Sequence, residues 1–292
     1  MAANPLRAQV SQLIRQQSPP RLSTLIEQSV RDSLVLRPDP RPDDEIPTGK
    51  SKLGGMPDLP LDVDWPAWKD HHLSFIAQIN LSDLPSVGFL EVLPENGVLS
   101  FFYSGEQTDW GFDPHHRGSW RILHLAEHDL HRRTCPPELE EGGIYKSCSL
   151  DWELSLTLPA LESPHVDLDY EREQWDEIAQ YFELMKGFRQ LLDEGSCIHR
   201  LLGHPDQIQG DMLLEAQLVS HGLYCGDATG YLDPRRKELE SGAGDWQLLL
   251  QVDSDDSAGM MWGDMGKLYY LMTSEHMRNN DFDGAWLVLQ CT

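Results

Sequence analysis

The sequence predicts a β-rich α+β fold, in which two similar antiparallel sheet units are related by internal duplication and carry covering helices. The first observation is a repeat of four short blocks in one order, which indicates a duplicated unit. Residues 53–58, 73–79, 97–102 and 118–123 are echoed by 201–206, 246–252, 266–271 and 284–289. The second is that most of these blocks are strand-like apolar runs. The third is that helical periodicity is strongest at the N-terminus and between the two sets of blocks.

The N-terminal segment, residues 1–49, is predicted to contain two short helices and a Pro-rich linker. Apolar residues share one helical face over 4–17, and a double proline separates this stretch from a second predicted helix over 21–34. Prolines at alternate positions in 37–44 favour extended, solvated chain. We therefore expect a linker or a surface strap in that stretch.

The first repeat unit is predicted over 50–126, with three strands over 73–79, 98–103 and 120–125. In the first strand, Leu73, Phe75, Ala77 and Ile79 share one face and Ser74, Ile76 and Gln78 the other, and the second strand is rich in aromatic residues. Asn96-Gly97 precedes the second strand, and this dipeptide is a strong signal for a tight turn.

A helical connection over 127–200 is predicted between the two units. Residues 149–158 alternate as a half-buried strand, and 170–193 is the clearest helix in the chain, with Gly195 where it should end. A helix in this position commonly covers a face of a sheet.

The second repeat unit is predicted over 201–292, so that 50–292 forms one domain. Asp211 is a candidate N-cap for a helix that begins at Met212. The strands over 246–252 and 286–289 correspond to the first and third strands of the other unit.

Composition limits the classes of function. The 292 residues are 40% hydrophobic, which suffices for a core, and the apolar runs are too short to span a bilayer. Five scattered cysteines without a Cys-x-x-Cys pair, and no secretion signal, predict a cytoplasmic protein with free thiols. The net charge is −25, and residues beyond 50 carry 42 of the 48 acidic but only 16 of the 23 basic groups. This charge disfavours nucleic-acid and membrane partners and favours a basic protein.

Two glutamines are candidate ligand-binding residues. Gln78 and Gln251 occupy equivalent places in the repeat, each near the end of an apolar strand. They could face a polar cleft between the units, with Trp262 and Asp264 from a nearby glycine-containing loop. Alternatively, each buried amide could hold an adjacent loop in place.

An acidic loop over 253–264 is a candidate metal site. Asp253, Asp255 and Asp264 fall at the first, third and twelfth positions of a calcium-loop spacing. Ala258 replaces the glycine that the sharp turn requires, and the flanking segments look like strands rather than helices. The sequence thus predicts no cofactor outright, and Ca²⁺ or another divalent metal remains an alternative to a solvated hairpin loop.

Several segments resemble the YwqG-like family, a group of largely uncharacterised, mainly bacterial proteins. The similar segments are 51–57, 75–81, 97–103, 248–254 and 262–266. The resemblance covers roughly 50–292 and implies an α+β fold with much β-structure. It implies no agreed activity and no catalytic residues.

Two functions stay open from the sequence. The leading hypothesis is a binding protein with an acidic surface and a basic protein partner, because Gly-x-Ser-x-Gly, His-Glu-x-x-His and phosphate-loop motifs are absent from the sequence. The alternative is an enzyme or small-ligand-binding protein with a site in the cleft between the two units.

Overall fold

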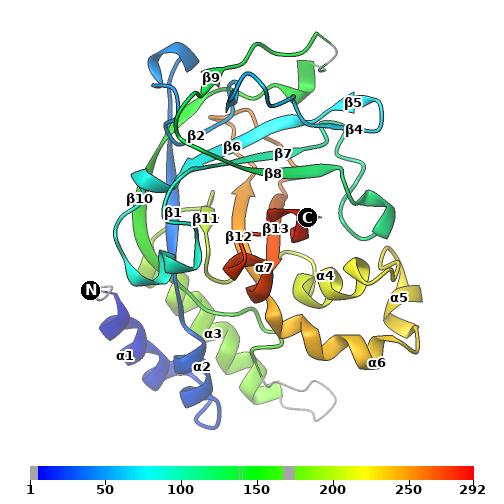
Figure 1. Ribbon diagram of the computed structural model, residues 1–292. Helices are drawn as coiled ribbons and strands as arrows, with labels where there is room; N and C mark the ends of the chain where they lie inside the picture. The colour runs from blue at the N-terminus through cyan, green and yellow to red at the C-terminus, as the bar shows by residue number, and fades with distance from the viewer. Residues whose placement is uncertain (1–5, 138, 140, 167–174) are drawn as a thin grey trace.

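A computed structural model describes residues 6–137, 139, 141–166 and 175–292 (Figure 1). Its helices are α1 (Arg7–Gln17), α2 (Ser23–Ser29), α3 (Trp175–Leu192), α4 (Met212–Ser220), α5 (Ala228–Leu232), α6 (Arg236–Leu239) and α7 (Ser274–Arg278). Within the described ranges, every helix is too short or too polar to cross a lipid bilayer.

Ten strands form one continuous antiparallel sheet. In spatial order they are β14 (Trp286–Gln290), β13 (Lys267–Thr273), β12 (Trp246–Asp253), β11 (His199–Leu201), β1 (Arg31–Pro40), β10 (Cys148–Thr157), β2 (Lys52–Leu53), β6 (Ser74–Asn80), β7 (Val98–Tyr103) and β8 (Trp120–Leu125). Two two-stranded sheets lie outside it: β3 (Asp58–Leu59) with β9 (His131–Arg132), and the hairpin of β4 (Ala67–Trp68) with β5 (His71–His72).

The prediction of two separate sheet units is wrong in one respect, because both units belong to one continuous sheet. The two sets of three strands, β6–β7–β8 and β12–β13–β14, lie at opposite ends of the same sheet. The central pair β1 and β10 joins them through ten consecutive residue pairs, from Arg31 opposite Thr157 to Pro40 opposite Cys148. The fold is α+β and β-rich, as the sequence predicts.

The N-terminal segment differs most from expectation. The second helix ends at Ser29, and the stretch expected as helix and then as linker forms β1, which is paired on both sides over 34–36. Beyond Leu36 the strand has a partner only in β10. Pro38 and Pro40 lie in this singly paired part, where a residue without an N–H can face the open side.

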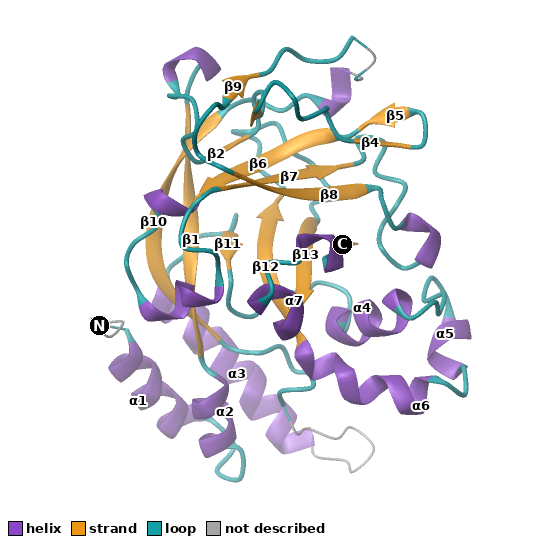
Figure 2. Cartoon of the chain, viewed as in Figure 1, coloured by secondary structure: helices purple, strands orange, loops and turns teal. Residues whose placement is uncertain are grey.

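The sheet curls strongly, so that its two ends face each other (Figure 2). The backbone N–H of Leu289 in β14 donates to the carbonyl of Trp110, which lies in the loop between β7 and β8. The rings of Phe101 in β7 and Tyr270 in β13 meet edge to face at 5.1 Å. The main apolar cluster consequently contains residues from both ends of the sheet.

Helices cover the sheet at two places. Helices α1, α2 and α3 pack together with Leu156 and Leu158 in a second apolar cluster, and α4 packs against β12 and β14. The sequence predicts α3 over 175–192 correctly, and its expected first residues, 170–174, lie outside the described residues. Asp211 caps α4 as expected, accepting the N–H of Leu213 at 2.9 Å.

Candidate functional site

Gln78 is fully buried on β6, and its amide holds the loop around Asp58. Its Oε1 accepts the backbone N–H of Asp58 at 3.0 Å, while Nε2 donates to the Asp58 carboxylate at 2.7 Å and to the Lys50 carbonyl at 2.7 Å. Arg132 Nε donates to the same carboxylate at 2.6 Å. Burial alone would raise the pKa of Asp58, but this hydrogen bond and the charge of Lys52 hold it below its ordinary value.

Gln251 has the same set of partners on β12. Its Oε1 accepts the backbone N–H of Asp206 at 2.9 Å, and Nε2 donates to the Asp206 carboxylate at 2.9 Å and to the Ile198 carbonyl at 2.8 Å. The buried Arg200 guanidinium lies 3.2 Å from the Asp206 carboxylate and 2.8 Å from that of Glu194. Burial would raise the pKa of Asp206, and the charge of Arg200 instead holds it low.

Each glutamine also stands opposite a buried cation in the neighbouring strand. Lys52 of β2 pairs with Gln78, and Arg200 of β11 pairs with Gln251. Because both hydrogens of each Nε2 are donated to protein groups, these amides hold loops in place rather than present free donors.

Gln78 and Gln251 bind separate loops, and four strands lie between β6 and β12 along the sheet. The space between the two ends of the sheet is filled by apolar side chains such as Trp120 and Trp286, whose ring centres lie 4.9 Å apart.

The other two residues of the predicted ligand site differ in burial. Trp262 is fully buried, packs edge to face against Tyr145 at 5.3 Å and donates from Nε1 to the Asp253 carbonyl at 3.1 Å. Asp264 is exposed shortly before β13, where its carbonyl accepts the N–H of Thr292 at 3.1 Å. Trp262 is thus part of the apolar core.

The predicted metal loop is a hairpin between β12 and β13, and its carboxylates diverge. Asp253 pairs with Lys267 Nζ at 2.9 Å and accepts the N–H of Ile198 at 2.9 Å. Asp255 turns instead toward His199. Asp264 shares neither set of contacts, so the described residues do not gather the three carboxylates of the calcium-loop spacing around one point.

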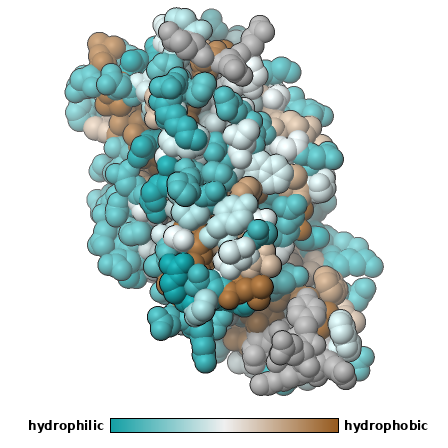
Figure 3. Space-filling model, turned by 90° about the vertical axis from the view of Figure 1, so that its right-hand side faces the viewer, coloured by the Kyte–Doolittle hydropathy of each residue, from teal (hydrophilic) through white to brown (hydrophobic). Residues whose placement is uncertain are grey.

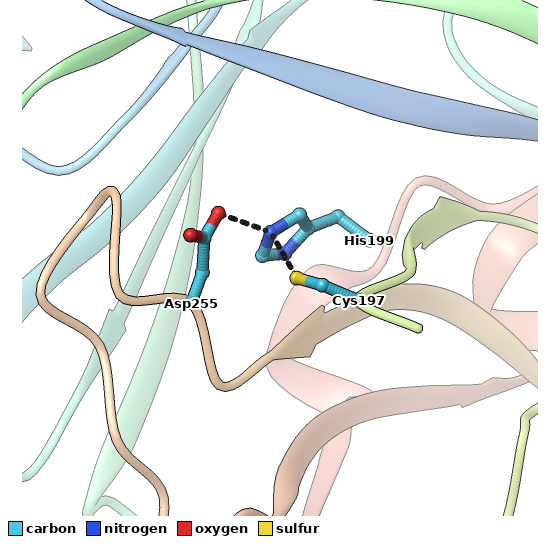
Figure 4. A group of neighbouring side chains, drawn as sticks. All are labelled: Cys197, His199 and Asp255. Carbon is cyan, nitrogen blue, oxygen red and sulfur yellow. Dashed lines mark hydrogen bonds and ion pairs between the residues drawn. The ribbon is translucent and has the colours of Figure 1, made fainter. Parts of the chain in front are cut away.

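Asp255 belongs to a different cluster, with Cys197 and His199 (Figure 4). His199 Nε2 lies 3.1 Å from Asp255 Oδ2 and 3.5 Å from Cys197 Sγ. One potential ligand atom from each residue lies within 4.8 Å of the others. His199 is buried and its two neighbours are half-buried, so the cluster sits just below the surface.

Hydrogen bonds and burial determine which atoms of this cluster carry protons. The backbone N–H of Asp253 donates to His199 Nδ1 at 3.2 Å, which places the proton of the neutral ring on Nε2, facing Asp255. That bond holds the pKa of the Asp255 carboxyl far below its ordinary value. Burial, with the carboxylates of Asp253 and Asp255, raises the pKa of the Cys197 thiol to about 12. Since the thiolate is the reactive form, Cys197 is not an activated nucleophile.

A surface pocket of about 450 Å³ lies beside the central strands β1 and β10. Its acidic lining residues are Asp39, Glu45, Asp83 and Asp151, and its basic ones are Arg41 and Lys50. The indole of Trp152 also lines it and is half-buried. Acidic groups therefore outnumber basic ones around an aromatic side chain.

Comparison with known sequences places the chain in a family. Residues 51–291 match the family described as "Domain of unknown function (DUF1963)". The chain belongs to the DUF1963 family. The match covers most of the chain and includes both ends of the sheet, while β1 lies before it. No curated protein matches this DUF1963 chain.

In this DUF1963 protein, Cys197 and His199 are partners of Asp255 that the sequence does not predict. One local signal was available: residues two apart on a strand point to the same face, so a Cys-x-His segment next to a strand presents both side chains together. The pairing of β11 with β12, which brings Asp255 to them across 56 residues of sequence, has no such signal.

Proposed function

We propose that this DUF1963 protein is a cytoplasmic binding protein that recognises a basic protein partner by taking its Arg or Lys side chains into the acidic pocket beside Trp152. The observation that carries the proposal is the composition of the pocket, in which four carboxylates and an indole surround a volume that fits a long basic side chain. The net charge of −25 supports attraction of such a partner over longer distances. Figure 3 shows a different face, the right-hand side of Figure 1, where hydrophilic residues surround scattered hydrophobic ones.

The ion pairs inside the pocket leave negative charge unbalanced. Arg41 Nη2 lies 2.6 Å from Asp39, and Lys50 Nζ lies 2.5 Å from Asp83. Within the described part of the chain, Glu45 and Asp151 have no comparable ion pair, although the charges of both help to raise the pKa of Arg41. An incoming guanidinium can bind these two carboxylates. Such hydrogen bonds between charged groups are stronger than those between neutral groups.

Trp152 adds a preference for a cationic side chain. Its half-buried indole lies beside the carboxylates on β10. The face of a tryptophan attracts a guanidinium or ammonium group by about 0.5–2 kcal/mol, and the aliphatic stem of Arg or Lys packs against the same ring. Together, the indole and the carboxylates favour Arg or Lys over a neutral side chain.

A charge-matched pair of variants tests the proposal. Binding of fluorescein-labelled deca-arginine is measured by fluorescence anisotropy at low and physiological salt. Glu45→Gln/Asp151→Asn should weaken binding about 10-fold, which corresponds to about 1.4 kcal/mol. The control Glu238→Gln/Asp245→Asn removes two exposed charges near α6 and should change binding less than about 3-fold. Equal losses in both variants would mean that only the overall charge matters, and would refute a local site.

We also infer that the two ends of the sheet arose by gene duplication and that the chain falls within the YwqG-like group of sequences. Equivalent positions support the duplication: the β6–β7 ladder is interrupted between Phe75 and Ala77, and the β12–β13 ladder between Leu248 and Leu250. The backbone of Gly54 and of Leu202 has φ near +58° and +59° at matching places. Superposition of 50–126 on 201–292 tests this inference, and strands that fail to align in this order would contradict it.

A further inference from the structure

We infer that Cys197, His199 and Asp255 form a binding site for a transition-metal dication, for which Zn²⁺ is the best match. The site is independent of the acidic pocket, because it uses different residues at the start of β11 and the end of β12. The distances between the donor atoms, the groups that orient these atoms and their chemical type support the site.

Two of the three distances between donor atoms are close to those in a tetrahedral metal site. With metal–nitrogen and metal–oxygen distances of about 2.1 Å and a metal–sulfur distance of about 2.3 Å, tetrahedral ligands lie about 3.4 Å apart for N and O and about 3.6 Å for S and N. The corresponding distances here are 3.1 Å between His199 Nε2 and Asp255 Oδ2 and 3.5 Å between His199 Nε2 and Cys197 Sγ. The Cys197 sulfur lies within 4.8 Å of the Asp255 oxygen, and binding of the ion would bring these two atoms to about 3.6 Å. The side chains point toward one another, as Figure 4 shows, so small adjustments would admit the ion.

Neighbouring groups fix two of the three donors in place. The second oxygen of Asp255 accepts the N–H of Ser257 at 2.7 Å and its hydroxyl at 2.6 Å, which leaves Oδ2 directed at His199. His199 belongs to β11, which pairs with β1 and β12 and is therefore held from both sides. Such outer contacts orient ligands in metal sites and raise affinity.

The donor types select among metals. A thiolate, an imidazole and one carboxylate suit Zn²⁺ and its neighbours in the first transition row, whereas Ca²⁺ and Mg²⁺ prefer six or more oxygen ligands. A dication would also offset the carboxylates of Asp253 and Asp255 and stabilise the Cys197 thiolate, whose proton passes to solvent. Three protein ligands leave a fourth position for water or a ligand atom.

Metal binding has one structural cost that also provides a readout. A neutral imidazole bound through Nε2 carries its proton on Nδ1, and in this structure Nδ1 accepts the backbone N–H of Asp253. The ring must give up that hydrogen bond when the ion enters. We therefore expect the amide resonance of Asp253 to shift on metal addition, while amides far from the site stay unchanged.

Cobalt and zinc titrations of the full chain, purified without chelator or affinity metal, test the inference. Co²⁺ should bind with 1:1 stoichiometry, give a thiolate-to-cobalt charge-transfer band and be displaced by Zn²⁺ but not by excess Ca²⁺. Cys197→Ser should abolish that band, and Asp255→Asn should lower affinity about 10–100-fold. The matched controls Cys135→Ser and Asp256→Asn should leave both the band and the affinity unchanged.

Two results would overturn the site. The first is an absence of stoichiometric Co²⁺ or Zn²⁺ binding to the folded wild-type protein, which would make the cluster a hydrogen-bonded link between β11 and the hairpin. The second is unchanged metal affinity in both Cys197→Ser and Asp255→Asn, with circular dichroism showing that the variants fold. Because neither replaces the buried His199, both test the site without disturbing β11.

Discussion

Trp120 and Trp286 hold the two ends of the curled sheet together through reciprocal contacts. Trp120 Nε1 donates to the carbonyl of Ala285 at 3.1 Å, and Trp286 Nε1 donates to the carbonyl of Gly111 at 2.8 Å. Their rings meet edge to face at 4.9 Å with an angle of 68° between the planes. Each tryptophan thus reaches into the other end of the sheet, and the space between the ends is an apolar core.

Replacement of one of these tryptophans should destabilise the whole fold. Trp286→Ala removes a buried aromatic side chain and its hydrogen bond, and we expect the free energy of unfolding to fall by about 3–5 kcal/mol. Phe182→Ala, at an exposed aromatic residue on α3, should change it by about 0.5 kcal/mol or less. Urea denaturation monitored by far-UV circular dichroism measures the free energy of unfolding of both variants. A decrease below about 1 kcal/mol in Trp286→Ala would argue against the contact.

The two glutamine networks should contribute to stability independently. Gln78→Leu leaves the backbone N–H of Asp58 and the carbonyl of Lys50 without their partner, at an expected cost of about 2–4 kcal/mol. Gln251→Leu should cost a similar amount. Since the networks share no residue, the double variant should show the sum of the two losses within about 0.5 kcal/mol. A strong deviation from additivity in denaturation measurements would reveal coupling across the sheet.

His204 should make the protein sensitive to acid. Its Nε2–H donates to the Ser29 carbonyl at 2.7 Å, and burial, followed by the charge of Arg31, lowers its pKa to about 3. As pH falls below about 6.5, the unfolded chain takes up a proton that the folded chain does not, so this stability contribution is lost progressively down to about pH 3. Between pH 6.5 and 4.5 the loss should be about 2–3 kcal/mol.

His204→Gln keeps a donor for Ser29 and should flatten that part of the pH profile. The control is His128→Gln, at an exposed histidine, which should leave the profile as in the wild type. Identical pH profiles for His204→Gln and the wild type would contradict the assignment to His204.

Glu215 should have the opposite pH dependence. Burial in α4, opposed by a hydrogen bond to Tyr231, raises its pKa to about 7. The folded chain therefore retains its proton to higher pH than the unfolded chain, and the stability present below about pH 4.5 is lost as pH rises through 7. Glu215→Gln should be more stable than the wild type by about 1–3 kcal/mol at pH 8 and equal to it at pH 4.5. Thermal melts at both pH values decide the matter, with Glu238→Gln as the exposed control.

Local signals in the sequence were enough for several elements. The strands over 98–103 and 120–125 match β7 and β8 at both ends, because aromatic and β-branched residues alternate there and Asn96-Gly97 marks the turn. The sequence also places the glutamines at equivalent sites. It could not decide their role, because Asp58 and Asp206 reach them only through the loops that fold back over β6 and β12.

Other features depend on partners that are remote in sequence. The stretch 31–40 reads as helix and linker because its prolines dominate the local pattern, and only pairing with β10 and β11 makes it a strand. In the same way, a single cysteine and a single histidine carry little information until β11 and β12 lie side by side. The missing element in both cases is strand order, which sequence periodicity does not encode.

The position of β1 has a practical consequence for work on relatives of this chain. The family match begins at residue 51, yet Arg31–Pro40 lies in the middle of the sheet, between β10 and β11. A truncated gene product that starts at residue 51 would lack β1, the strand that joins the two halves of the sheet. The edges of β10 and β11 would then be exposed to neighbouring molecules. Such a fragment should aggregate or recruit a foreign strand, so boundaries for expression should be drawn ahead of Arg31.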